Sequence, residues 1–346
     1  MIHFKYDAVS VFLNRSCPRN CPQCGLTQEK KKHLSIDEWI QTFQILNEEL
    51  GVRFFLILGT EPLLFGDDLV KLIKWFTKNN LFYAFYSTSP PALFKKYREK
   101  LIDAGLTNWA CGIDTLPGKG WTDAITEKKT QEGIEGLIWM GERGLQTWTL
   151  TTVTNQNLQH VPEIVEWCQL NIPNVLSCVN PVEWRHNDSF DFFARKEDMA
   201  DMVIPAERHE EVIQMAEELF VLTRRPGFQI QNPDSYLLNY PRFYNTLNYV
   251  CNGVVGFGVD CDGSLRLCGY SKGAHTPKYF VKDLQTKKDE ILMGGYEDAH
   301  NCLGCHWSYV SALQETYESL IPGTAYYTER HKQAIPSIRE HLKRMK

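Results

Sequence analysis

The sequence predicts an α/β fold built on a parallel sheet, and two observations support this prediction. The chain has 346 residues, of which 43% are apolar and 23% are charged, as expected for a globular protein with one large domain and a smaller one. Short apolar runs also alternate with longer amphipathic segments over the first two thirds of the chain. Such alternation builds a parallel sheet whose strands are joined by right-handed crossover helices.

The alternation begins with an apolar strand at residues 8–13, which a cysteine-rich loop follows. Ser35 and Glu38 are spaced as a capping box, which predicts the start of a helix. Apolar residues then recur at helical spacing up to Gly51, a typical residue at the end of a helix. Residues 54–58 are all apolar, as expected for a parallel strand that is covered on both faces.

The same unit repeats along the chain. The predicted elements after residue 58 are helices at 68–78, 91–103, 131–143, 161–170 and 205–223, and strands at 81–86, 109–113, 147–153 and 175–179. Six strands are too few for a closed eight-stranded barrel. Open parallel sheets bind ligands outside the carboxyl ends of their strands, and the cysteine-rich loop lies at this edge.

The alternating pattern breaks near residue 225, where we predict a domain boundary. Residues 1–225 then form the α/β domain, residues 226–325 a small α+β domain, and residues 326–346 a basic C-terminal helix. Within the second domain, Asp262-Gly263 between two apolar runs predicts a β-hairpin.

Charge and hydropathy make several classes of protein poor candidates. The net charge of −5 gives no basis for nucleic-acid binding, which depends on Lys and Arg. The sequence lacks a signal peptide and an apolar run long enough to cross a membrane. An odd count of 11 cysteines in a long chain indicates a protein of the reducing cytoplasm rather than a disulfide framework.

Three cysteines follow the first predicted strand at the spacing C-x3-C-x2-C, namely Cys17, Cys21 and Cys24. A structural zinc site needs four ligands. A ferredoxin-type cluster needs a fourth nearby cysteine, and none follows before Cys111. Three thiolates instead favour a 4Fe–4S cluster whose fourth iron is open to a small molecule.

This motif resembles the signature of the radical S-adenosylmethionine (SAM) enzymes. The resemblance implies a partial (β/α)6 barrel, a 4Fe–4S cluster held by the three cysteines, and SAM bound at the open iron. It also implies reductive cleavage of SAM to a 5′-deoxyadenosyl radical, which abstracts hydrogen from a substrate. The electron would come from a donor such as flavodoxin or ferredoxin.

The segment after the second strand resembles a SAM-binding motif of the same family. Gly59, Thr60, Glu61 and Pro62 match Gly-Gly-Glu-Pro, which contacts the SAM amino group, except that Thr60 replaces the second glycine. A carboxylate is a suitable partner for an ammonium group, since both charges strengthen the hydrogen bond. The alternative is an ordinary turn between a strand and a loop.

Three further residues match SAM-contacting positions of the family. Ser87 ends the third strand, where the family has a polar turn, and Asp114 ends the fourth, where a polar residue contacts the ribose. Asp is also common in turns and helix caps, so both alternatives remain open. Gln23 stands where the family usually has an aromatic residue near the adenine; its amide could contact the base or face solvent.

A second group of cysteines lies near the C-terminus, at the spacings C-x16-C and C-x2-C. Its members are Cys251, Cys268, Cys302 and Cys305. They resemble the Twitch domain of radical SAM enzymes, a shortened SPASM domain that holds one auxiliary 4Fe–4S cluster. By spacing alone, a zinc ribbon is the alternative, and Cys261 could replace one of the four.

Together these resemblances predict a radical SAM enzyme that acts on a small molecule or a peptide. The auxiliary cluster would accept an electron from the product radical, which gives a net oxidation or a cross-link. The alternative from another class is a non-catalytic iron–sulfur electron carrier or a zinc-stabilised binding protein.

Overall fold

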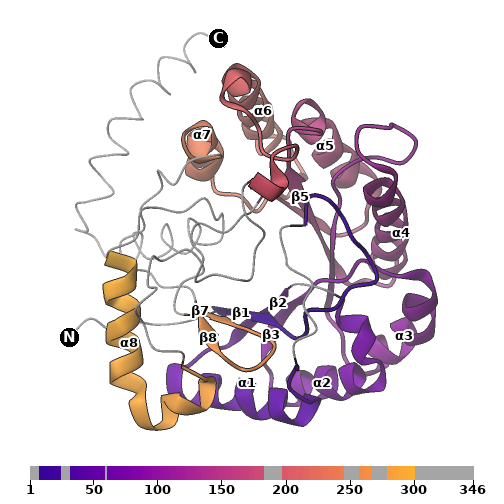
Figure 1. Cartoon of the computed structure of the whole chain (residues 1–346). Coiled ribbons are helices and arrows are strands. Elements are labelled where there is room, and N and C mark those ends of the chain that lie inside the picture. Colours follow the sequence, from indigo (N-terminus) through magenta and orange to yellow (C-terminus); the bar gives the residue numbers. More distant parts are fainter. Residues whose placement is uncertain are drawn as a thin grey trace.

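The structure is a computed structural model that describes residues 8–24, 32–58, 61–182, 197–244, 257–266 and 279–300. In these ranges a curved sheet is wrapped on its outer side by helices, which follow the curve in sequence order except that the last one, Leu284–His300, lies beside the first (Figure 1). The predicted α/β class and the open parallel barrel are confirmed.

All six predicted strand–helix units are present. Their strands are β1 (Ala8–Phe12), β2 (Phe54–Leu58), β3 (Phe82–Phe85), β4 (Asn108–Gly112), β5 (Gln146–Val153) and β6 (Val175–Pro181). Their helices are α1 (Ile36–Leu50), α2 (Asp67–Lys78), α3 (Pro91–Asp103), α4 (Ala124–Gly141), α5 (Val161–Asn171) and α6 (His209–Leu222). Later elements are α7 (Asp234–Phe243), β7 (Phe257–Val259), β8 (Leu265–Arg266) and α8 (Leu284–His300).

The six strands form two parallel ladders, which an isolated bridge joins in sequence order. β1, β2 and β3 pair in parallel, and so do β4, β5 and β6. Between these two ladders, Tyr86 forms a parallel bridge with Ala110, and the Ser87 N–H donates to the Ala110 carbonyl at 2.9 Å. The carboxyl ends of all six strands therefore lie along the same edge of the sheet.

The two faces of this sheet have different surroundings. In β6, buried residues alternate with the partly exposed Leu176, Cys178 and Asn180. The buried faces of the strands pack against helices: Val9 and Val11, for example, share a cluster with Trp39 of α1. The core thus lies between sheet and helices, and the other set of side chains lines the concave interior.

Helix α1 has the ends that the sequence predicts. The Ser35 hydroxyl accepts from the Glu38 N–H at 3.3 Å, and a Glu38 carboxylate oxygen accepts from the Ser35 N–H at 2.7 Å. Gly51 ends the helix with φ of +70°, a conformation that glycine adopts without steric cost. The capping box is confirmed.

Helix α4 begins earlier than the predicted residue 131. The Asp123 side chain caps it, because one carboxylate oxygen accepts from the N–H groups of Ile125 and Thr126 at 2.9 and 3.0 Å. Residues 124–130 are mostly polar, so hydrophobic periodicity does not reveal this first part of the helix. The earlier start places Lys129 on the buried face of α4.

Residues beyond position 225 stay in contact with the barrel. Ile230 forms a parallel bridge with Ser177 of β6. Tyr236 and Tyr240 of α7 share a hydrophobic cluster with Leu219 of α6. The boundary near residue 225 remains a prediction, and the predicted helix at 326–346 lies outside the described residues.

The predicted hairpin around Asp262-Gly263 is present as the antiparallel pair β7 and β8. Gly263 has φ of +81° at the turn, which favours glycine. β7 also pairs in parallel with β1, so the hairpin extends the sheet beyond its first strand.

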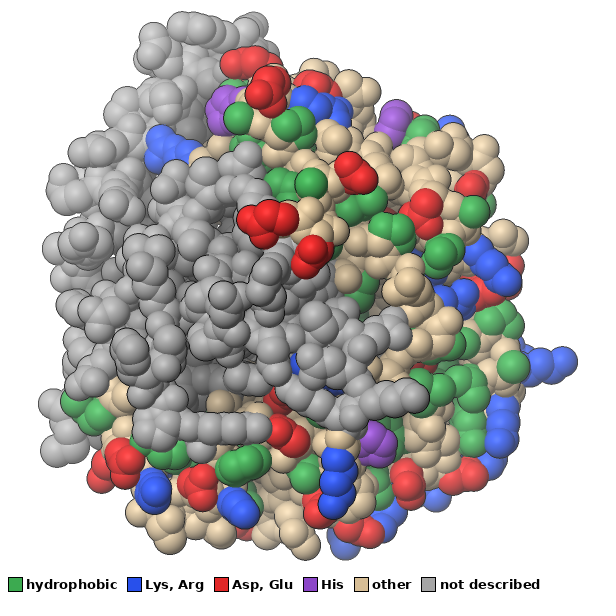
Figure 2. Space-filling model, in the orientation of Figure 1, with side chains coloured by type: hydrophobic (Ala, Val, Ile, Leu, Met, Phe, Trp, Pro, Cys, Tyr) green, Lys and Arg blue, Asp and Glu red, His purple; other side chains and the backbone are tan. Residues whose placement is uncertain are grey.

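The described surface gives no sign of a membrane span or of a single charged patch. None of the described helices is both long and apolar enough to cross a membrane. On the face in Figure 2, Lys and Arg side chains are interspersed with Asp and Glu.

Candidate active site at the carboxyl edge of the sheet

The structure brings the predicted site residues that it describes to one edge of the sheet. The cysteine loop follows β1, and Glu61, Ser87 and Asp114 follow β2, β3 and β4. Backbone bonds join the first two loops, since the Glu61 N–H donates to the Ser16 carbonyl at 3.1 Å. Gly59 and Thr60 lie outside the described residues, as do Cys251, Cys268, Cys302 and Cys305.

The thiols of the cysteine loop differ in exposure. Cys17 and Cys21 are partly buried, whereas Cys24 is exposed. Burial raises the pKa of Cys17 to about 12 and that of Cys21 to about 11. Both thiols are therefore protonated near neutral pH, and binding a metal would release their protons because the ligand is the thiolate.

The donor set suits an iron–sulfur cluster. The Arg19 N–H donates to the Cys17 sulfur at 3.4 Å, and such hydrogen bonds to sulfur influence cluster potential. In the described ranges, no three His, Cys, Asp or Glu side chains already converge as metal ligands. The fit to a cluster therefore rests on the chemistry and spacing of the three thiols.

The Glu61 carboxylate joins the loops after β2 and β3. It is fully buried, and one of its oxygens accepts from the Leu63 N–H at 3.1 Å and the Ser87 hydroxyl at 2.8 Å. The other accepts from the Thr88 N–H at 2.8 Å and the Thr88 hydroxyl at 2.7 Å. Burial raises the pKa of Glu61, although these hydrogen bonds oppose the shift.

Ser87 and Pro62 complete this arrangement. The Ser87 hydroxyl also accepts from the Ser89 N–H at 3.0 Å, so it organises the turn that contains it. Pro62 begins a short 3-10 helix with Glu61 as its N-cap, a position where proline has no hydrogen bond to lose.

Asp114 connects three separate parts of the chain. It is only 2% exposed. One carboxylate oxygen accepts from the Thr152 N–H of β5 at 2.8 Å, and the other accepts from the Gln23 amide at 2.8 Å and pairs with Lys129 of α4. Gln23 is therefore turned inward and does not face solvent.

A buried ion pair connects the cysteine loop to the β7–β8 hairpin. The Arg15 guanidinium donates to both oxygens of Asp260, with the Nε–Oδ1 distance at 3.0 Å, and the two side chains are 2% and 0% exposed. The Cys261 N–H donates to Asp260 Oδ1 at 2.7 Å, and the Leu34 N–H donates to the Cys261 carbonyl at 2.8 Å.

Sequence reasoning missed both Lys129 and the Arg15–Asp260 pair. Asp123 is a typical N-cap residue, and a helix that starts there has Thr126, Lys129 and Gly133 on one face. This signal could have predicted that Lys129 lies on the buried face of α4. Arg15 and Asp260 are separated by 245 positions, and no local pattern relates them.

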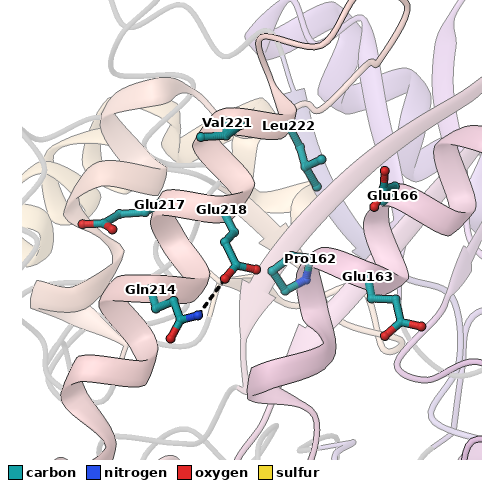
Figure 3. A pocket seen from close by; sticks show the side chains of 8 residues that line it. All are labelled: Pro162, Glu163, Glu166, Gln214, Glu217, Glu218, Val221 and Leu222. Atoms are coloured by element: carbon teal, nitrogen blue, oxygen red, sulfur yellow. Dashed lines mark hydrogen bonds between the residues drawn. The ribbon is translucent and has the colours of Figure 1, made fainter. Parts of the chain in front are cut away.

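A groove of about 500 Å³ lies elsewhere, between α5 and α6 (Figure 3). It is lined by Pro162, Glu163, Glu166, Gln214, Glu217, Glu218, Val221 and Leu222. None of these residues belongs to the loops at the carboxyl edge, so the groove is separate from the candidate site.

The fold and the site together define a class of protein: enzymes with an open parallel barrel whose first loop carries three cysteines. Residues 11–168 match the family model of the Radical SAM superfamily. This family implies a 4Fe–4S cluster and SAM as cofactors.

Two curated relatives have the same name, "Probable GTP 3',8-cyclase", and come from Methanococcus maripaludis strains. The relative from strain DSM 14266 is 26% identical over 302 residues, covering 79% of this chain and 92% of its own length. The relative from strain C5 is 26% identical over 300 residues with the same coverage.

Solved structures show the same fold. SuiB of Streptococcus suis bound to S-adenosylmethionine has a TM-score of 0.62 at 14% identity, over 83% of this chain and 66% of SuiB. SuiB bound to its precursor peptide SuiA has a TM-score of 0.62 at 16% identity, over 90% and 73%. The anSMEcpe enzyme with AdoMet and the Cp18Cys peptide has a TM-score of 0.57 at 14% identity, over 84% and 81%.

Proposed function

We propose that this enzyme cleaves SAM reductively at a 4Fe–4S cluster held by Cys17, Cys21 and Cys24. The observation that carries this proposal is the three-cysteine loop at the carboxyl edge of six parallel strands in a chain that matches the Radical SAM family model. A reduced cluster held by these residues would supply one electron to SAM, so that the S–C5′ bond breaks to give methionine and a 5′-deoxyadenosyl radical able to take a hydrogen atom from the substrate.

The chain's own residues would shape the SAM site. Four donors already occupy the acceptor positions of the Glu61 carboxylate, so we assign Glu61 to joining the segments after β2 and β3, beside the proposed SAM-contacting residues Gly59, Thr60 and Pro62. In the described ranges, Asp114 Oδ1 accepts a hydrogen bond from the Thr152 N–H. Its second lone pair suits a hydroxyl donor such as the SAM ribose.

Cys251, Cys268, Cys302 and Cys305 are proposed to hold an auxiliary 4Fe–4S cluster in a Twitch-like domain. The described hairpin lies between the first two of them in sequence, and it pairs with β1 directly before the cysteine loop. This pairing supports a location near the site, where the cluster could accept an electron from the product radical. Cys261 is fully buried in the hairpin turn, and it remains a candidate to replace one of these four ligands.

The substrate is proposed to present an uncharged group to the barrel interior. None of the six strands β1–β6 contains Lys, Arg, Asp or Glu. Triphosphates are bound through cationic side chains and helix N-termini, so these strands suit a peptide side chain or an uncharged metabolite. The peptide complexes of SuiB and anSMEcpe agree with this proposal.

GTP is the second candidate substrate, because the curated relatives are named as probable GTP 3',8-cyclases and align over most of their length. Loops beyond the strands would then have to supply the positive charge. Incubation with SAM and reductant separates the candidates. Peptides or metabolites that lose two hydrogens in mass spectra support the first, whereas conversion of GTP supports the second.

Metal analysis and SAM cleavage test the proposal as a whole. Anaerobic reconstitution should give about eight irons per chain, four for each cubane cluster, and 5′-deoxyadenosine should form under strong reductant. Cys17→Ala should abolish its release, and Cys302→Ala should retain SAM cleavage but block product formation. Cys168→Ala is the matched control, because Cys168 lies buried in α5. Zinc with little iron, or undiminished cleavage by Cys17→Ala, would contradict the proposal.

A further inference from the structure

Lys129 is a buried cation beside the cysteine loop. Its side chain is 6% exposed, and it forms an ion pair with Asp114, which is 4% exposed. Gly112 leaves room for the ammonium group, because a Cβ atom there would lie 3.3 Å from Lys129 Nζ. Full burial of a lysine is uncommon unless the charge is paired, so this position calls for an explanation.

Gln23 connects this ion pair to the predicted cluster ligands. It precedes Cys24 directly and follows Cys21 by two positions. Its amide nitrogen donates to Asp114 Oδ2 at 2.8 Å, the same oxygen that pairs with Lys129. Its amide oxygen accepts from the Thr126 hydroxyl of α4 at 2.9 Å. Both ends of the side chain are thus held, and the loop is fixed to α4.

Lys129 remains protonated in this network, because its ammonium group is paired with the Asp114 carboxylate. Burial lowers the pKa of Lys129, but the Asp114 carboxylate that pairs with it raises the pKa, so the net shift is upward. Asp114 Oδ2 contacts both Lys129 Nζ and the amide nitrogen of Gln23, which lies in the cysteine loop between Cys21 and Cys24. The charged pair is therefore attached directly to the loop that carries the predicted cluster ligands.

We propose that Lys129 is a positioning residue that sets the electrostatics of the SAM-binding cluster, with Gln23 and Asp114 fixing its place. This inference rests on the proposed function, since it needs a cluster on Cys17, Cys21 and Cys24. A nearby cation favours the reduced, more negative cluster, whereas a nearby carboxylate favours the oxidised one. The Asp114 carboxylate partly cancels the effect of the Lys129 ammonium on the cluster potential. Removing the Lys129 charge and removing the Asp114 charge should therefore shift this potential in opposite directions.

The test is a redox titration followed by electron paramagnetic resonance, before SAM is added. All variants carry Cys302→Ala, so that the auxiliary site contributes less to the signal. Lys129→Met should lower the midpoint potential of the cluster, Asp114→Asn should raise it, and Lys129→Arg should leave it near the parent value. Lys119→Met is the charge-matched control, because Lys119 pairs with Glu163 at the exposed surface.

A purely structural ion pair would move the potential in the same direction in both variants, or not at all, and either result would overturn the inference. If Lys129→Met does not fold, Asp114→Asn and Lys129→Arg still test the sign. Failure of the proposed function has a different signature: the parent chain would then show no 4Fe–4S signal. Thermal unfolding of the metal-free variants separates lost stability from a shift in potential.

Discussion

Removing one partner of the Arg15–Asp260 pair should be among the most damaging single changes to this chain. Both side chains are almost fully buried, and the guanidinium donates to both carboxylate oxygens. Asp260→Ala leaves the Arg15 charge buried without its carboxylate partner, which typically costs about 3–5 kcal/mol of stability. Exposed ion pairs contribute about 0–1 kcal/mol.

The assay is urea denaturation of the metal-free chain, followed by circular dichroism. Lys71→Ala is the control, because its pair with Asp37 is 51% and 70% exposed. The double variant Arg15→Met/Asp260→Leu replaces both charges with apolar groups of similar volume and should recover most of the loss. The reasoning is refuted if Asp260→Ala costs no more than Lys71→Ala.

Three further predictions concern single positions around the site. Glu61→Gln places an amide NH2 opposite two of the four donors. The free energy of unfolding in urea should fall by about 1–3 kcal/mol, and unchanged stability would contradict the assigned role of Glu61. The folded-state pKa values of Cys17 and Cys21, about 12 and 11, lie above the ordinary value of 9.0. Their contribution to the stability of the folded state is therefore complete below pH 9 and is lost as pH rises towards 12. Replacing both cysteines with alanine should flatten the curve of stability against pH in this range. An unchanged slope would count against the pKa shifts. Gly133→Ala should destabilise α4, despite the better helix propensity of alanine, because the new Cβ would lie 2.4 Å from the Cys111 sulfur. Adding Cys111→Ala should raise the thermal unfolding temperature again. If it does not, this clash is not the cause.

The sequence predicted those parts of the fold that depend on local patterns. Residues 54–58 are apolar throughout and form β2, and the capping box at Ser35 begins α1 as expected. Asp262-Gly263 likewise forms the turn between β7 and β8. In each case the decisive interactions lie within a few residues, so the pattern alone was sufficient.

The site was predictable only in part. The cysteine loop and Glu61 were found because their residue types are distinctive and follow strand ends. The burial of Lys129 was not predicted, because the first turns of α4 are polar and show no hydrophobic periodicity. Lysine also usually lies on the exposed face of a helix. Arg15 and Asp260 meet only because β7 pairs with β1, which is a long-range contact without a local signal.

The pairing of β7 with β1 has a consequence for synthesis of the chain. Until residues 257–259 have left the ribosome, the outer edge of β1 lacks its neighbour, although β2 can already cover the other edge. An unpaired strand edge is a template for aggregation, and this edge of β1 stays exposed while the roughly 245 residues between β1 and β7 are made. Nascent chains that stall before residue 257 should therefore depend more strongly on chaperones than the completed protein.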